Sequence, residues 1–317
     1  MPDYQQPMKS KSFLHSPLSR LLVIATLLIG SGCAYLETKQ GDWIFSPVQG
    51  EWRGYRGTPQ GIEEVWIPVG TKGEKLYAWW SPLPDKNAPA LLYLHGARWN
   101  LTGSVTRIPR WNKMGFSVLA IDYRGFGKSV FVDGGSPTEQ SANEDAEAAW
   151  HFLAARDEAG VTKKYIFGHS LGASMATHLA LKVKDASGLI LEGAFTSVPD
   201  MIKATRWGFL PVSFLVTQRF DVFDRIDDVK IPILLAHGTS DDIVPFTMGE
   251  RLFAAARAQK RFFRAEGGSH HNLTANFFDE YQRAVSEHFG LNLNRVAQSP
   301  NPAAGFGAAA SADAATR

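Results

Sequence analysis

The chain has 317 residues, of which 44% are hydrophobic and 12% aromatic, so it can bury one large hydrophobic core or two modest ones. Its 33 lysine and arginine residues nearly balance 31 aspartate and glutamate residues. This balance argues against nucleic acid as a partner, because phosphate binding depends on a basic surface. The single cysteine excludes a disulfide framework and any zinc site built from several thiolates.

Residues 1–32 have the order of a secretion signal. Basic residues precede a nine-residue stretch, 21–29, that is apolar except for Thr26, and small residues then lead to Cys33. The apolar run is shorter than the roughly 18 residues that a membrane-spanning helix needs. A cleaved signal peptide is therefore expected here rather than a permanent membrane span.

The end of this segment resembles a bacterial lipoprotein signal, in which a cysteine becomes acylated and forms the new N-terminus. Gly30 departs from that pattern, which usually has an aliphatic residue there. The resemblance implies a lipid anchor on Cys33 and, since Ala34 follows it, a place at the outer membrane on its periplasmic side. A plain secretion signal would instead give a soluble periplasmic or secreted protein. Residues 33–50 are expected to form a tether.

Over residues 51–290, short apolar runs alternate with helical segments, which is typical of an α/β domain with a mostly parallel central sheet flanked by helices. The middle runs are continuously apolar, as in strands buried on both faces. The expected strands are 64–69, 76–80, 90–94, 118–121, 165–167, 188–191, 233–236 and 261–264. The expected helices are 141–155, with Ser141 as its N-cap, 171–183 and 277–289.

Two segments depart from this alternation. Residues 195–223 gather Trp207, Phe209 and Phe214 around Pro211, which indicates an inserted helical cap or, alternatively, a crossover helix with a large buried face. Residues 291–317 become rich in alanine and poor in large apolar side chains, so a disordered tail is expected.

Ser170 is the candidate nucleophile. The stretch Gly168-His169-Ser170-Leu171-Gly172 follows an expected strand and opens an expected helix, which is the setting of a nucleophile elbow. The N–H of Leu171 would lie at the helix N-terminus, where it can stabilise an oxyanion. A second oxyanion donor is expected from the loop after strand 90–94, and Ala97 is the candidate. His95 is expected to brace that loop.

Candidates for the acid and the base follow the last two strands. Asp241 and Asp242 come after strand 233–236, and His270 and His271 lie in a glycine-rich loop after strand 261–264. The chain order of serine, aspartate and histidine is that of a triad on a sheet of this kind. A histidine in this loop can take the serine proton while an aspartate fixes its tautomer.

These stretches, together with Leu94-His95-Gly96, Asp122 to Ser129 and Ile231 to Pro245, make the sequence similar to an α/β-hydrolase of the branch that contains abhydrolase-type thioesterases and acylglycerol lipases. The resemblance implies the α/β-hydrolase fold and places the acid on Asp241, with Asp242 as the fallback. It places the base on His270, although alignment on the following asparagine would select His271.

The resemblance implies hydrolysis of a small-molecule ester or thioester through an acyl-Ser170 intermediate. A peptidase or an acyltransferase could use the same triad, and a non-catalytic envelope protein could keep the fold to bind a ligand. The residues suggest neither a metal nor an organic cofactor. Relatives often have Asn-Ala-Gly where this chain has Arg98-Trp99-Asn100, so the oxyanion loop is expected to have a shape of its own.

Overall fold

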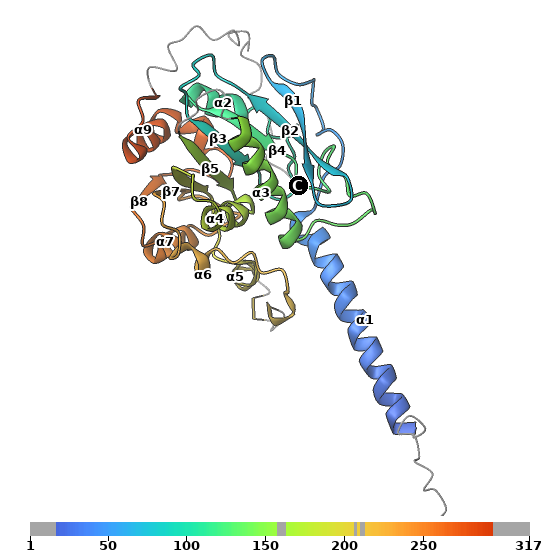
Figure 1. Cartoon of the computed structure of the whole chain (residues 1–317). Helices are drawn as coiled ribbons and strands as arrows, with labels where there is room; N and C mark the ends of the chain where they lie inside the picture. The colour runs from blue at the N-terminus through green and yellow to red at the C-terminus, as the bar shows by residue number, and fades with distance from the viewer. Residues whose placement is uncertain (1–16, 157–162, 206–207, 210–212, 294–317) are drawn as a thin grey trace, which may run out of the picture.

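The computed structural model describes residues 17–156, 163–205, 208–209 and 213–293. Its centre is an eight-stranded sheet with the strand order β1-β2-β4-β3-β5-β6-β7-β8 (Figure 1). The strands are β1 (Glu63–Val69), β2 (Glu74–Ser81), β3 (Ala90–Leu94), β4 (Ser117–Ile121), β5 (Lys164–His169), β6 (Gly188–Glu192), β7 (Ile233–Gly238) and β8 (Lys260–Ala265). All eight expected strands are therefore present.

The sheet is mostly parallel. β2 pairs antiparallel with β1 and β4, and the remaining neighbours pair parallel. Parallel strands end at one edge of the sheet, and the loops after β3, β5, β7 and β8 carry the residues expected to do the chemistry.

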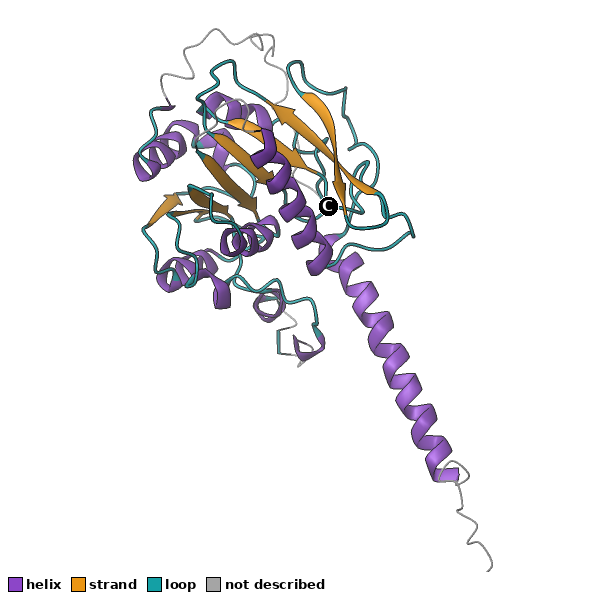
Figure 2. Ribbon diagram, in the orientation of Figure 1, coloured by secondary structure: helices purple, strands orange, loops and turns teal. Residues whose placement is uncertain are grey.

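Helices cover both faces of the sheet (Figure 2). The core on one face contains residues of α3 (Glu139–Ala155), α4 (Gly172–Lys182), α6 (Phe223–Ile226) and α7 (Phe246–Ala255). The core on the other face contains residues of α2 (Ile108–Met114) and α9 (Phe278–Phe289), and α8 (Leu273–Asn276) precedes α9.

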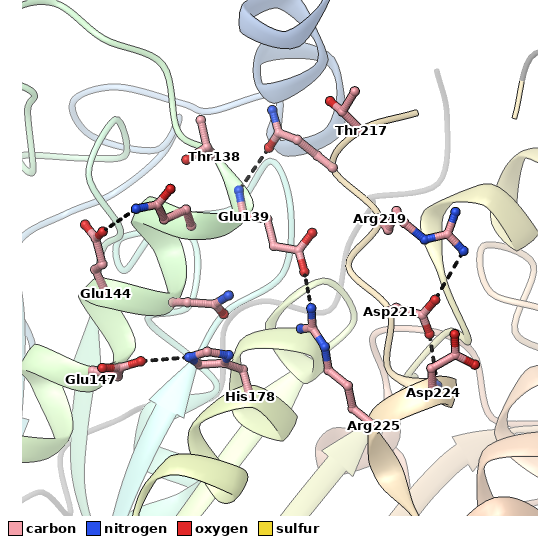
Figure 3. A pocket seen from close by; sticks show the side chains of 13 residues that line it. Thr138, Glu139, Glu144, Glu147, His178, Thr217, Arg219, Asp221, Asp224 and Arg225 are labelled. Carbon is pink, nitrogen blue, oxygen red and sulfur yellow. Dashed lines mark hydrogen bonds and ion pairs between the residues drawn. The ribbon is translucent and has the colours of Figure 1, made fainter. Parts of the chain in front are cut away.

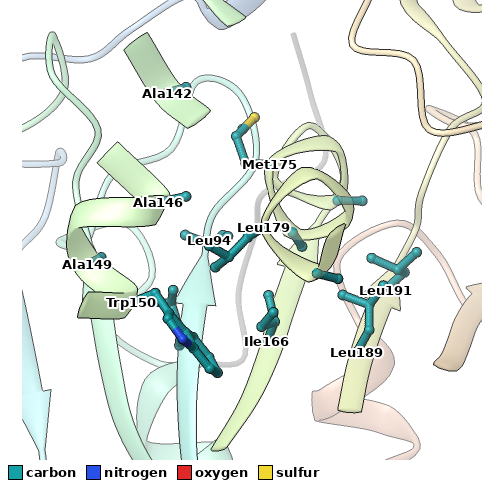
Figure 4. Close-up of a cluster of buried hydrophobic side chains, with 14 of the residues drawn as sticks. Leu94, Ala142, Ala146, Ala149, Trp150, Ile166, Met175, Leu179, Leu189 and Leu191 are labelled. Atoms are coloured by element: carbon teal, nitrogen blue, oxygen red, sulfur yellow. The ribbon is translucent and has the colours of Figure 1, made fainter. Parts of the chain in front are cut away.

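Strand β3 is apolar at every position because both of its faces are buried. Leu92 and Leu94 belong to the first core, whereas Leu91 and Tyr93 belong to the second. Figure 4 shows the first core, where the small alanines of α3 let Trp150 lie close to the strands.

The N-cap of helix α3 differs from the predicted one. Thr138, and not Ser141, is the N-cap, because its hydroxyl accepts a hydrogen bond from the N–H of Ser141 at 3.0 Å. The hydroxyl of Ser141 accepts one from the N–H of Thr138 at 2.8 Å. This reciprocal pair forms a capping box, and the helix therefore begins at Glu139, closer to the N-terminus than predicted.

Helix α1 (Pro17–Phe45) is 29 residues long, runs through Cys33 and projects from the domain (Figure 1). Within the described residues, no helix combines the length and the apolar character that a membrane span requires. Lipid attachment to Cys33 stays a prediction.

The prediction that residues 33–50 form a tether is wrong for the second half of that range. Phe45 is fully buried, and its ring lies 5.3 to 6.5 Å from those of Phe220, Phe126 and Tyr123. Val48 and Gly50 exchange backbone hydrogen bonds with Gly127. Burial of the aromatic ring outweighs the freedom of a tether, so the folded domain begins before residue 51.

Residues 195–223 do not form one long crossover helix. They contain the short helix α5 (Val198–Ala204), the 3₁₀ turn Ser213–Leu215 and the start of α6. Phe209 is 75% exposed, so it does not join a core, and Trp207 and Pro211 lie outside the described residues. The predicted tail also lies outside them beyond Leu293, which is buried.

Candidate functional site

Ser170 occupies the tight turn between β5 and α4. Its φ is +54°, a left-handed conformation that is unfavourable for a residue with a Cβ. The two glycines of the elbow are required by space: a Cβ on Gly168 would collide with the carbonyl of Gly172, and one on Gly172 with the carbonyl of Leu94. The sequence pattern thus holds the hydroxyl at the sheet edge.

A cavity of about 430 Å³ opens beside Ser170. Ala97, Leu171, His270 and His271 also line it. The other walls are mostly apolar and come from α1, the cap and the loop after β7, namely Ile44, Phe195, Val198, Met201, Ile243 and Val244. The cavity therefore offers a hydrophobic space next to polar groups, as ligand sites commonly do.

The acid and base candidates meet next to this cavity. His270 Nδ1 lies 2.7 Å from Asp241 Oδ2, and the other carboxylate oxygen accepts hydrogen bonds from the N–H groups of Ile243 and Val244 at 2.9 and 2.8 Å. Burial opposes ionisation of Asp241, but hydrogen bonds from His237 and His270 outweigh it and lower the pKa of the carboxyl group. Asp241 is therefore a carboxylate that can orient His270.

The alternatives take other places. Asp242 is exposed, whereas the side chain of Asp241 is fully buried. The ring of His271 stacks on Trp99, with their centroids 5.1 Å apart. Burial, His270 and Arg107 lower the pKa of His271 to about 4, so its ring is neutral at physiological pH. Of the two histidines, His270 is the one paired with a buried aspartate.

The loop after β3 turns sharply at the predicted oxyanion donor. The N–H of Trp99 donates to the carbonyl of Ala97 at 2.8 Å, and Arg98 between them has a φ of +67°. This is the strained form of a γ-turn. Within the described part of the chain, the N–H groups of Ala97 and Leu171 have no hydrogen-bond acceptor, so both are free to bind a ligand oxygen.

His95 is buried beneath this loop. Its Nδ1 donates to the carbonyl of Gly96 at 2.7 Å, and its ring packs on Tyr123 and Phe126. Burial lowers the pKa of His95 to about 4. These contacts fit a bracing role.

A buried ion pair behind the site had no signal in the sequence. Arg107 and Glu192 are in contact, and the backbone carbonyl of Glu192 accepts the N–H of Ser170 at 2.9 Å. Arg107 also lies 3.4 Å from His169, whose Nε2–H donates to the carbonyl of His270 at 3.0 Å. Burial and the charge of Arg107 hold the pKa of His169 well below its usual range.

Three histidine rings lie close together beside the cavity. One ring nitrogen from each of His169, His270 and His271 lies within 4.8 Å of the others. Tetrahedral zinc holds nitrogen ligands at about 2.0–2.1 Å, which places them about 3.4 Å apart. The three rings would therefore have to move closer together before one ion could bind all of them. The geometry favours a base over a metal ligand.

A larger, polar cleft of about 730 Å³ lies between α3, α4 and residues 217–225 (Figure 3). Its charged groups pair across it: His178 with Glu147 at 2.7 Å, and Arg225 with Glu139 at 3.1 Å. The cavity at Ser170 has mostly apolar walls and is lined by both the candidate nucleophile and His270, so it is the stronger candidate for chemistry.

The chain is similar to known proteins over much of its length. The family model described as "Serine aminopeptidase, S33" matches residues 85–220. Protein bem46 of Schizosaccharomyces pombe is 32% identical over 212 residues, which cover 65% of this chain and 69% of that protein. Lysophosphatidylserine lipase ABHD12 of Danio rerio is 30% identical over 220 residues, which cover 62% of this chain but only 56% of the lipase.

Among solved structures, the esterase Pf2001 of Pyrococcus furiosus matches with a TM-score of 0.62 at 19% identity, over 77% of this chain and 97% of the esterase. That likeness concerns the fold. Together with the relatives and the nucleophile elbow, it leads to one conclusion: the chain belongs to the α/β-hydrolase superfamily and is a serine hydrolase.

Proposed function

We propose that the protein hydrolyses carboxylic esters or thioesters through an acyl-Ser170 intermediate. The observation that carries this proposal is the pairing of His270 with the buried carboxylate of Asp241 beside the cavity that Ser170 also lines. A similar lipase and a similar esterase fold support ester bonds as the target.

In this mechanism the Oγ of Ser170 attacks the substrate carbonyl carbon while Nε2 of His270 takes the hydroxyl proton. Asp241 holds the Nδ1 proton of His270 and stabilises the imidazolium that forms. His270 then gives its proton to the departing alcohol or thiol. Water, activated by the same histidine, releases the acid and restores Ser170.

The negative charge on the carbonyl oxygen would be met by the N–H groups of Ala97 and Leu171. Leu171 precedes α4, whose helix N-terminus adds a favourable partial charge. Each fixed donor of this kind contributes about 10²–10³ to kcat in serine hydrolases.

The walls of the cavity favour an ester with an apolar acyl or alcohol part. An aminopeptidase must also bind a cationic amino terminus, which calls for a carboxylate. Among the described residues that line the cavity there is no aspartate or glutamate, and the cationic Arg98 lies there instead. Peptide cleavage is therefore the second candidate, and the family model's description is what favours it.

Attachment to a membrane leaflet through Cys33 remains a prediction, as does a place at the outer membrane. Mass spectrometry of the N-terminal peptide would detect the acyl groups, and an unmodified Cys33 would exclude the anchor.

The test is labelling of the full chain, kept in mild detergent, with a fluorophosphonate probe. The wild type and His271→Gln are expected to react with the probe, and Ser170→Ala should not react. In His270→Gln the rate of labelling should fall by at least about 10³-fold. Folded wild-type protein that takes no label would reject the serine hydrolase mechanism and favour the ligand-binding alternative. A series of p-nitrophenyl esters would then set the preferred acyl length.

A further inference from the structure

The C-terminal end of α1 contacts the oxyanion loop. The carbonyl of Phe45 accepts the N–H of Arg98 at 2.7 Å, and Ile44 lines the cavity. The side-chain amide of Asn100, which ends the loop, donates to the carbonyls of Val48 and Gly50 at 3.2 and 2.9 Å. The loop is thus held from outside the sheet by a segment that precedes β1.

The held residue is the strained one. Arg98 is the central residue of the γ-turn, and its φ of +67° is unfavourable for a side chain with a Cβ. The peptide between Ala97 and Arg98 supplies the carbonyl of the turn on one side and the N–H bound by Phe45 on the other. The Phe45 carbonyl therefore fixes the peptide directly after the Ala97 N–H.

Phe45 can act as a rigid acceptor because its own position is fixed. Its side chain is fully buried among Tyr123, Phe126 and Phe220, and His95 packs on the first two of these rings. Phe45 thus joins the same aromatic cluster that braces the loop from below.

The preceding turn of α1 is fixed to the cap. Gln40 Nε2 donates to the carbonyl of Leu215 at 2.9 Å, and its Oε1 accepts the N–H of Thr217 at 2.8 Å. A Cβ on Gly41 would collide with the carbonyl of Pro137, so the helix needs glycine at this close approach. The end of α1 is thereby tied to the cap as well as to the oxyanion loop.

We propose that Phe45 is a positioning residue for catalysis: its buried ring holds its carbonyl where it keeps Arg98 in the strained turn and Ala97 N–H aimed at the oxyanion. The inference rests on the proposed function, since it concerns the same oxyanion hole. It makes the end of α1 part of the catalytic unit.

The prediction concerns kcat rather than substrate affinity. Without a firm acceptor, the turn at Arg98 can relax and Ala97 N–H loses its aim, which weakens binding of the transition state more than binding of the substrate. Phe45→Ala in the full chain is expected to lower kcat for p-nitrophenyl butyrate by about 10–100-fold and to change KM by less than about threefold. Affinity for a trifluoromethyl ketone, which forms a tetrahedral adduct with Ser170, should fall by the same factor as kcat.

Two variants separate positioning from general destabilisation. Phe116→Ala removes another fully buried aromatic ring from the core on the opposite face, and it should lower the melting temperature while leaving kcat within about twofold. Phe45→Leu keeps a smaller apolar anchor and should recover at least half, but not all, of the lost kcat on a logarithmic scale. It serves as the test if Phe45→Ala does not fold.

An unchanged kcat in either folded Phe45 variant, or equal losses in Phe45→Ala and Phe116→Ala, would overturn the inference. Failure of the wild type to react with fluorophosphonate would instead reject the proposed function, so the two failures are distinguishable.

Discussion

Two buried arginines show how the same side chain can serve the fold in one place and the site in another. Arg124, in the turn after β4, donates to Asp145, Glu74 and Glu144 at 2.6, 2.7 and 2.8 Å, and also to the carbonyl of Ser141. Arg107, before α2, has one carboxylate partner, Glu192, and both Arg107 Nε and Glu192 Oε2 lack a hydrogen-bond partner among the described residues.

The difference lies in what surrounds each arginine. The carboxylates around Arg124 come from β2 and α3, so its charge ties a strand, a turn and a helix together, and neither Arg124 nor these carboxylates line the cavity at Ser170. Arg107 lies next to His169 and helps to keep His169 and His271 neutral. The charge of Arg124 is fully paired and therefore serves the fold. The charge of Arg107 is paired with one carboxylate only and therefore also acts on the neighbouring histidines.

The largest expected effect is on the satisfied network. Arg124→Met leaves the buried carboxyl groups of Asp145 and Glu74 without a cation, so the free energy of unfolding should fall by about 3–5 kcal/mol. Urea unfolding measures this loss. Arg261→Met, which removes a pair with the exposed Glu287, is the control and should cost no more than about 0.5 kcal/mol. Equal losses in the two variants would contradict the assigned role of Arg124.

The second prediction separates the two arginines by double replacement. Arg107→Met/Glu192→Leu replaces both members of a buried pair by apolar side chains and leaves no unpaired carboxylate from that pair. The free energy of unfolding of this double variant should therefore lie within about 1 kcal/mol of the wild-type value. Arg124→Met/Asp145→Leu should stay destabilised because Glu74 remains buried and unpaired.

The double variant Arg107→Met/Glu192→Leu is expected to lose about tenfold in kcat. His169, which donates to the backbone carbonyl of His270, loses a fixed neighbour in this variant. Steady-state kinetics at a temperature where the variant is fully folded provide the measurement. A fully active variant would reduce Arg107 to a structural role.

The smallest effect concerns the charge on His271. Its pKa of about 4 in the fold lies below the value near 6.5 of a free histidine, so the ring of His271 stays neutral at physiological pH and does not take part as an acid. His271→Gln should therefore leave the acid midpoint of kcat/KM unchanged. A midpoint that moves with this substitution would make His271 the titrating base.

Stability should respond to His271 with a defined sign. The unfolded chain takes up a proton on this ring near pH 6.5 and the folded chain only near pH 4, so the contribution of His271 to stability falls as pH falls through that window. Urea unfolding at several pH values should show a shallower acid loss in His271→Gln than in wild type. In Arg107→Met/Glu192→Leu the pKa of His271 should rise, since one cause of its depression is gone.

Local patterns predicted much of this protein. The eight strands follow from short apolar runs, and the elbow at Ser170 follows from glycines that the turn requires sterically. The order of Ser170, Asp241 and His270 follows from the order of the strands they succeed. The cap of α3 was misplaced by three residues because Thr138 and Ser141 can both accept a backbone hydrogen bond, and only the chain path decides between them.

Other features depend on partners far away in the sequence. Arg107 and Glu192 are 85 positions apart. The sequence around Phe45 predicts a tether, but the structure buries the ring of Phe45 in an aromatic cluster formed by residues far away in the chain. Neither has a local pattern, because a buried ion pair or a loop held by a distant carbonyl forms only when the strands are already in place. The sequence by itself therefore determined the sheet, its turns and the kinds of residue at its edge. The tertiary structure decided that His270 faces the buried carboxylate, that Arg107 lies behind the nucleophile, and that the end of α1 holds the oxyanion loop.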